Sequence, residues 1–161
     1  MTSKKEILIK KELEKNLNIL DKALETFKYS FENCKKIDIK EEYSYEELDK
    51  FEALTSRFAR ISDILTQKIL KSIFLLLRED VKTFIDRINR AEKLEIIDSA
   101  EQLKVIRDLR NEIAHEYCLE DISEIFENVL NHSGVLLGII DKVKTYIDIK
   151  QLILEDEAKV S

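Results

Sequence analysis

Proline is absent from the sequence, and glycine occurs only twice, at Gly134 and Gly138. β-hairpins and tight turns depend on these two residue types, because glycine tolerates left-handed backbone angles and proline fixes a bend. We therefore do not expect an all-β fold. The two glycines lie four residues apart in an apolar stretch, and we expect them to allow another helix of the fold to approach closely.

Apolar residues recur every three or four positions along most of the chain, which is the period of an amphipathic helix. The pattern predicts five helices, over residues 4–36, 45–78, 81–94, 100–115 and 121–149. We therefore predict an all-α fold, an antiparallel helical bundle with two long N-terminal helices. A coiled coil of the first two helices is the alternative, but it would leave the apolar faces of the shorter helices uncovered.

Three of the predicted helices begin with the sequence of a capping box, in which a Ser or Asp is followed three residues later by Glu or Gln. The pairs are Ser44 with Glu47, Ser99 with Gln102, and Asp121 with Glu124. No repeat or linker divides the chain, which indicates a single domain over residues 1–161. Residues 150–161 are expected to form a frayed tail.

Charge and cysteine content narrow the classes of function. The net charge is −6, so any contact with RNA has to be local, through a few placed cations. Cys34 and Cys118 form no Cys/His cluster, and we expect no metal and no cofactor.

The longest apolar run, residues 73–77, is too short to span a bilayer. The N-terminus lacks the apolar core of a signal peptide, so we expect a cytoplasmic protein without membrane contact.

One segment of the fourth predicted helix carries the residues of a reactive site. Helical geometry places four apolar residues on its buried face, Val105, Ile106, Leu109 and Ile113. Arg110 lies at the edge of that face, whereas His115 lies on roughly the opposite side. Asn111, one turn before His115, is placed to orient its imidazole. Tyr117 follows two residues later and offers a phenol for stacking, hydrogen bonding or nucleotide transfer.

This set of side chains suits cleavage of RNA through its own 2′-hydroxyl. The reaction needs a group that takes the 2′-hydroxyl proton, a group that protonates the 5′-oxygen, and positive charge against the phosphate. Imidazole exchanges protons near neutral pH, and guanidinium supplies a permanent forked charge. One histidine and one arginine are few for these tasks, which favours two copies of the chain meeting at the site.

Two further residues have alternative interpretations. Asp63 lies on the second predicted helix with Arg60 three residues before it. It either orients Arg110 or His115 from that neighbouring helix, or it forms an ordinary pair with Arg60 on a solvated face. Arg107 either adds affinity for phosphate beside Arg110 or is a surface arginine without a role. His132 has no catalytic spacing to another residue, and we interpret it as structural.

The spacing of Arg110, His115 and Tyr117 matches the Arg-x4-His-x-Tyr motif, and the chain thereby resembles the HEPN superfamily, specifically its HepT-like toxins. Asn111 fits the polar residue that often follows the arginine. The stretch from residue 51 to residue 73, with Arg-Phe-Ala-Arg-Ile-Ser-Asp at 57–63, looks like the long second helix of that group. The resemblance covers residues 51–117 and extends to the first and last helices only by architecture.

The resemblance implies a metal-independent ribonuclease toxin that acts as a homodimer. Arg110 and His115 would be catalytic, with Asn111, Tyr117 and Asp63 in support. It also implies a minimal nucleotidyltransferase antitoxin that adds AMP to Tyr117. The alternative is a non-catalytic binding module that docks this nucleotidyltransferase. A helical adaptor in which the motif is a coincidence is the third interpretation.

Overall fold

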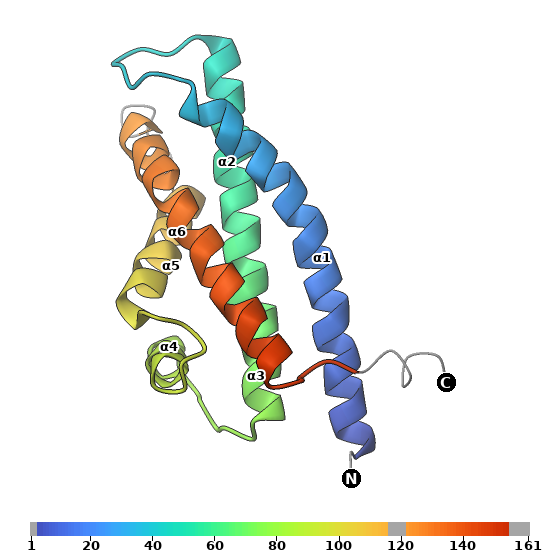
Figure 1. The fold of residues 1–161 in the computed structure, drawn as a ribbon. Helices are drawn as coiled ribbons and strands as arrows, with labels where there is room; N and C mark the ends of the chain where they lie inside the picture. Colours follow the sequence, from blue (N-terminus) through green and yellow to red (C-terminus); the bar gives the residue numbers. More distant parts are fainter. Residues whose placement is uncertain (1–2, 116–121, 155–161) are drawn as a thin grey trace.

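The chain folds into an all-α bundle, seen in a computed structural model that describes residues 3–115 and 122–154 (Figure 1). Within these ranges every regular element is helical, as predicted. The elements are α1 (Lys4–Lys35), α2 (Tyr45–Asp63), the π-helical segment η1 (Ile64–Ile69), α3 (Leu70–Leu76), α4 (Phe84–Lys93), α5 (Ala100–His115) and α6 (Ile122–Ile149). None of the described helices is long and apolar enough to cross a membrane.

The consecutive elements α2, η1 and α3 form the central rod of the bundle. The rod contacts α1 along its length, and its α2 portion also packs against α5 and α6. In Figure 1, α1 and the rod run side by side, while the short α4 lies below the start of α5. The rod corresponds to the single helix predicted over 45–78, so the packing of this helix against the shorter ones confirms a bundle rather than a two-helix coiled coil.

Side-chain caps explain where the helices begin. Ser44 and Glu47 form the predicted capping box, with the Glu47 amide 3.1 Å from the Ser44 hydroxyl and the Ser44 amide 2.9 Å from the Glu47 carboxylate. Ser99 accepts a hydrogen bond from the Gln102 amide at 3.1 Å, which sets the start of α5. The capping box predicted at Asp121 lies outside the described residues.

The third predicted helix begins later than expected. It was predicted from residue 81, but α4 starts at Phe84 because the Thr83 hydroxyl accepts the Asp86 amide at 3.0 Å and so caps the helix. Threonine satisfies one of the free amides of a helix start, and the chain before it stays extended. The end of α6 also differs, because the Leu152 side chain is buried and its amide bonds to the Ile147 carbonyl. The frayed tail expected from residue 150 therefore does not include Leu152.

The core is one continuous cluster of aliphatic and phenyl side chains from all six α-helices and η1. Its largest fully buried members are Phe27, Phe51, Phe58, Phe126, Leu13, Leu20, Leu54, Ile61, Leu65, Ile69, Leu70 and Ile73. At about 25 cal/mol per Å² of apolar surface removed from water, this burial is the main stabilising contribution to the fold. Arg57 adds a polar link between α2 and α1, since its guanidinium donates to the Thr26 carbonyl at 3.2 Å and to the Ser30 hydroxyl.

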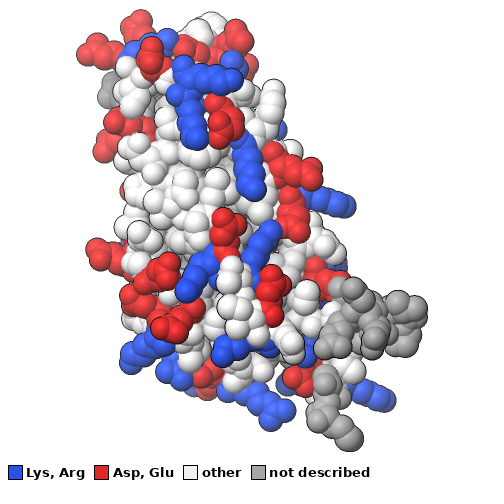
Figure 2. Space-filling model, viewed as in Figure 1, with Lys and Arg blue, Asp and Glu red and all other residues white. Residues whose placement is uncertain are grey.

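Two sequence expectations about packing are wrong. Val105 was placed on the buried face of α5 but is 39% exposed, because the core contacts α5 through Leu103, Ile106 and Leu109 instead. Gly134 and Gly138 were expected to admit a neighbouring helix. A Cβ atom at either glycine would meet no heavy atom within 4 Å, so no described helix packs there. Figure 2 shows an uncharged area over this part of α6, where residues 130–140 carry no Lys, Arg, Asp or Glu.

Among the described helices, three end in the same motif, in which a residue with positive φ follows the last turn. These residues are Arg78 (58°), Glu95 (61°) and Gln151 (52°). The amide after each of them bonds to a carbonyl five residues back, and the bonds are Glu79 to Phe74, Ile96 to Ala91 and Leu152 to Ile147. Glycine is preferred at this position, because a Cβ atom crowds the following carbonyl in left-handed backbone.

We predict that Glu95→Gly stabilises the protein. Removal of the Cβ atom relieves the left-handed strain at an exposed position, and the free energy of unfolding should rise by about 1 kcal/mol. Urea-induced unfolding measures the change. The matched control Glu95→Ala keeps the strained Cβ atom and should stay close to wild type. A glycine variant that is less stable than the alanine variant would contradict this account of the α4 terminus.

Candidate functional site

Helix α5 carries the predicted site residues, and its bounds agree with those predicted from the sequence. Leu103, Ile106 and Leu109 are buried and fix the rotation of α5 against the bundle. Arg110 and Asn111 are consequently half-buried, and His115 is exposed as the last residue of the helix. Tyr117, which the motif also includes, lies outside the described residues.

Arg110 of α5 pairs with Asp63, the last residue of α2. Its Nε donates to Asp63 Oδ1 at 2.7 Å, and its Nη2 donates to Oδ2 at 2.8 Å. The hydrogen bonds to Asp63, with the attraction of the opposite charge, raise the pKa of Arg110, which keeps the guanidinium charged. The sequence left open whether Asp63 faces Arg110 or Arg60. The contact with Arg110 is confirmed, and its part in function stays a prediction.

The pair holds Arg110 without using all of its hydrogen-bonding capacity. A guanidinium has five N–H donors in a fixed fork, and three of them bond to no other residue of the described ranges. The side chains of Arg110 and Asp63 are 30% and 40% exposed, so solvent or a ligand reaches them. Arg110 is therefore a positioned and partly accessible cation, although its charge is balanced by Asp63.

The π-helical segment η1 begins immediately after Asp63. Within it, the Leu70 amide bonds to the Leu65 carbonyl, five residues back. An α-helix would pair that amide with the Thr66 carbonyl. The Thr66 carbonyl instead accepts a hydrogen bond from Arg87 Nη1 of α4 at 3.3 Å. Burial lowers the pKa of Arg87. Short π-helical segments occur often at functional sites, and this one lies directly beside the Asp63–Arg110 pair.

The sequence did not reveal η1 or Arg87. The apolar spacing continues through residues 64–69, and no Pro or Gly marks a change of helix type there. The only local signal is the pair Ser62 and Thr66, four residues apart and buried, with the Thr66 hydroxyl donating to the Ser62 carbonyl at 2.9 Å. Such bonds are common in ordinary helices, so they do not identify a π-helical segment.

Arg107 lies one turn before Arg110 on the same side of α5. Its guanidinium stacks over the ring of Phe84 in α4, with the central carbon 4.3 Å from the ring centroid. A cation over an aromatic face is attracted by the ring electrons, and the edge of the guanidinium stays available for other partners. Arg107 is therefore held in place, which the sequence could not show.

His115 lies on a different side of α5 from Arg110. Five residues turn a helix by about 140° from its starting direction and advance it by about 7.5 Å. The exposed residues nearest to His115 in this projection are Lys104 and Asp108, which pair with each other at 2.8 Å, followed by Glu101 and Glu112. No hydrogen bond joins His115 to another residue of the described ranges. Within one chain, the structure brings Asp63 to Arg110 but does not bring His115 to either.

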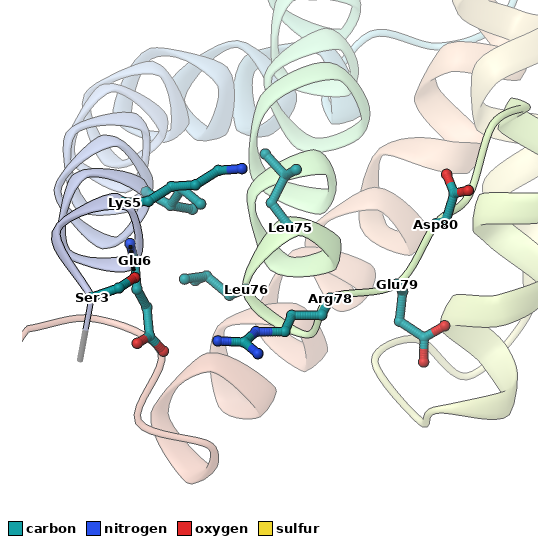
Figure 3. A pocket seen from close by; sticks show the side chains of 9 residues that line it. Ser3, Lys5, Glu6, Leu75, Leu76, Arg78, Glu79 and Asp80 are labelled. Atoms are coloured by element: carbon teal, nitrogen blue, oxygen red, sulfur yellow. Dashed lines mark hydrogen bonds between the residues drawn. The ribbon is translucent and has the colours of Figure 1, made fainter. Parts of the chain in front are cut away.

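Two hollows on the molecule differ in character. An apolar cavity of about 220 Å³ lies between α2, α5 and α6, with Phe51, Ile113 and Phe126 among its walls. Ile113 belongs to the motif helix, so this cavity adjoins the candidate site. A second hollow of about 470 Å³ lies between the start of α1 and the end of α3. Figure 3 shows Lys5 and Arg78 there together with Glu6, and no motif residue lines it.

The described part of the chain contains no group of three or more His, Cys, Asp or Glu side chains that could hold a metal ion. Comparison with models of known protein families, with curated proteins and with solved structures gave no match. The resemblance to HEPN toxins therefore rests on the motif and on the residues around it.

Proposed function

We propose that the chain is a metal-independent HEPN ribonuclease toxin that acts as a homodimer, with Arg110 and His115 as its catalytic residues. The observation that carries the proposal is the position of Arg110. Both carboxylate oxygens of Asp63 hold this side chain, and the helix that carries it, α5, also ends in an exposed His115. A fixed guanidinium with free donors is suited to phosphate oxygens, and forked pairing of this kind is strong.

The proposed reaction is transfer of the phosphorus from the 5′-oxygen to the 2′-oxygen of the preceding ribose. A base takes the 2′-hydroxyl proton, the 2′-oxygen attacks phosphorus, and the P–O5′ bond breaks. An acid gives a proton to the departing 5′-oxygen, and the products are a 2′,3′-cyclic phosphate and a 5′-hydroxyl. His115 supplies proton transfer, and Arg110 stabilises the negative charge on the phosphate oxygens.

The direction of the two side chains favours a site made by two copies of the chain. Arg110 and His115 point about 140° apart on one helix, and Arg110 is already held by Asp63. One chain also offers a single motif histidine, whereas the reaction needs both a base and an acid. Two motif helices facing each other would supply two imidazoles and two guanidiniums to the same phosphate.

We predict that His115→Ala and Arg110→Ala each lower the rate of RNA cleavage by about 10²–10⁴-fold, because each removes proton transfer or charge stabilisation from the transition state. Gel analysis of a labelled RNA measures the rate, with EDTA present because the proposed reaction needs no metal. Arg60→Ala is the matched control, since Arg60 is exposed on α2. Both variants should keep the wild-type circular dichroism.

Mixed dimers test whether the site is shared. When equal amounts of wild-type and His115→Ala subunits exchange partners, half of the wild-type subunits enter mixed dimers. A shared site makes these inactive, so activity per wild-type subunit falls to about half. Unchanged activity per wild-type subunit would show that each chain works alone. Wild-type protein that cleaves no RNA, or variants that cleave as fast as wild type, would contradict the ribonuclease proposal.

The proposal includes regulation by a nucleotidyltransferase antitoxin that adds AMP to Tyr117. An adduct two residues after His115 would occupy the RNA site and place phosphates near the catalytic cations. We predict that the protein, when produced together with such an enzyme and ATP, gains mass in steps of one AMP and loses cleavage activity. Tyr117→Phe should gain no such mass. Modification of the phenylalanine variant to the same extent would assign the acceptor elsewhere.

A second function is favoured by the Asp63 carboxylate. It neutralises Arg110, and an uncharged pair attracts phosphate less than a free guanidinium does. A non-catalytic binding module that docks the nucleotidyltransferase would need no free charge at this position. That module would cleave no RNA but would still bind the enzyme, and both properties would survive His115→Ala.

A further inference from the structure

Three arginines line one junction of the bundle, between α2–η1, α4 and α5. Arg110 bonds to Asp63, and Arg87 bonds to the Thr66 carbonyl one helical turn farther along the same rod. Arg107 lies one turn from Arg110 on α5 and stacks on Phe84, which is one turn from Arg87 on α4. Each guanidinium is thus fixed by a contact, and the contacts place all three in one arginine cluster at this junction.

The arginine cluster carries an excess of positive charge in an acidic protein. Among the described residues, Asp63 is the only carboxylate that forms an ion pair with any of these three arginines. Arg87 bonds to a neutral carbonyl, and Arg107 stacks on a neutral ring. Three cations and one anion leave a local charge of about +2. All three side chains are half-buried, so the charge is less screened than on an open surface.

The acidic residues of α5 point away from Arg110. Relative to Arg110, helical geometry places Arg107 about 60° away, whereas Asp108 and Glu112 lie about 160° away on the far side. Asp108 also pairs with Lys104, at 2.8 Å. The net charge of −6 therefore does not describe the field at the arginine cluster.

We infer that the cluster of Arg87, Arg107 and Arg110 binds consecutive phosphates of a single-stranded RNA. The inference rests on the proposed function and deepens it, since it gives the substrate a path along α4 and α5 that leads to Arg110. Each guanidinium has N–H donors beyond those used in its contact described above within the described residues, and forked donors match phosphate oxygens. The cluster holds the strand through its backbone, so binding is independent of base sequence.

A single-stranded RNA oligonucleotide with 2′-O-methyl groups and a fluorescent label is the probe. It lacks the 2′-hydroxyl that cleavage requires, so its binding is measured whether or not the protein is a ribonuclease. We predict that Arg87→Gln and Arg107→Gln each weaken binding several-fold. Each should also reduce the slope of log affinity against log salt by about 0.7, because one phosphate contact is lost.

Two variants separate charge from structure. Arg87→Lys keeps the positive charge and should keep the wild-type salt slope, even if the lysine does not reproduce the hydrogen bond to the Thr66 carbonyl. Arg78→Gln removes one arginine charge at the far end of the rod, where Arg78 is exposed, and should bind as wild type. Circular dichroism confirms that each variant is folded.

The outcomes distinguish this inference from the ribonuclease proposal. Wild-type affinity and salt slope in both Arg87→Gln and Arg107→Gln would overturn the role of the arginine cluster, even if ordinary RNA is cleaved. Arginine-dependent binding without cleavage of ordinary RNA would support that role and reject the ribonuclease. Wild-type protein that binds ATP but not the oligonucleotide at low salt would overturn the inference, because the phosphates recognised would then belong to a nucleotide.

Discussion

The forked contact between Asp63 and Arg110 is the interaction on which the candidate site depends. It joins α2 to α5 across 47 residues of sequence, and it sets the direction of Arg110, a motif side chain that is partly buried in the bundle. Without Asp63, the guanidinium would rotate freely on its four single bonds and lose the orientation that phosphate recognition needs. The contact also balances the charge of Arg110, so binding of an anion relies on neighbouring arginines.

The helices could be predicted from the sequence, because apolar spacing and capping residues are local signals. The bounds of α5 and the capping box at Ser44 are examples. The π-helical segment could not be predicted, since residues 64–69 keep the apolar spacing of an α-helix. Val105 was misplaced because a helical projection ranks faces but does not say how wide the buried stripe is. The partner of Asp63 required the fold, because Arg60 and Arg110 are equally suitable in chemistry.

The arrangement explains how an acidic chain can present a site for an anion. On helix α5, Arg107 contacts α4 and Arg110 contacts α2, whereas Asp108 and Glu112 lie on the other side, where Asp108 pairs with Lys104. His115 lies on that other side at the exposed end of the helix, where a second copy of the chain can reach it. On α6, Gly134 and Gly138 lie in an uncharged stretch, and a Cβ atom at either glycine would meet no neighbouring helix of the described bundle. Helix α5 therefore packs into the core through Leu103, Ile106 and Leu109 and carries the candidate site residues outside that face.

A double-mutant cycle of Asp63→Ala and Arg110→Ala in the free energy of unfolding tests the central contact most directly. Both side chains are partly exposed, so solvent screening limits the expected coupling to about 0.5–1 kcal/mol. The account predicts that the two substitutions together cost less than the sum of their separate costs by this amount. Strictly additive costs would show that Asp63 does not hold Arg110, and the site built on that contact would have to be abandoned.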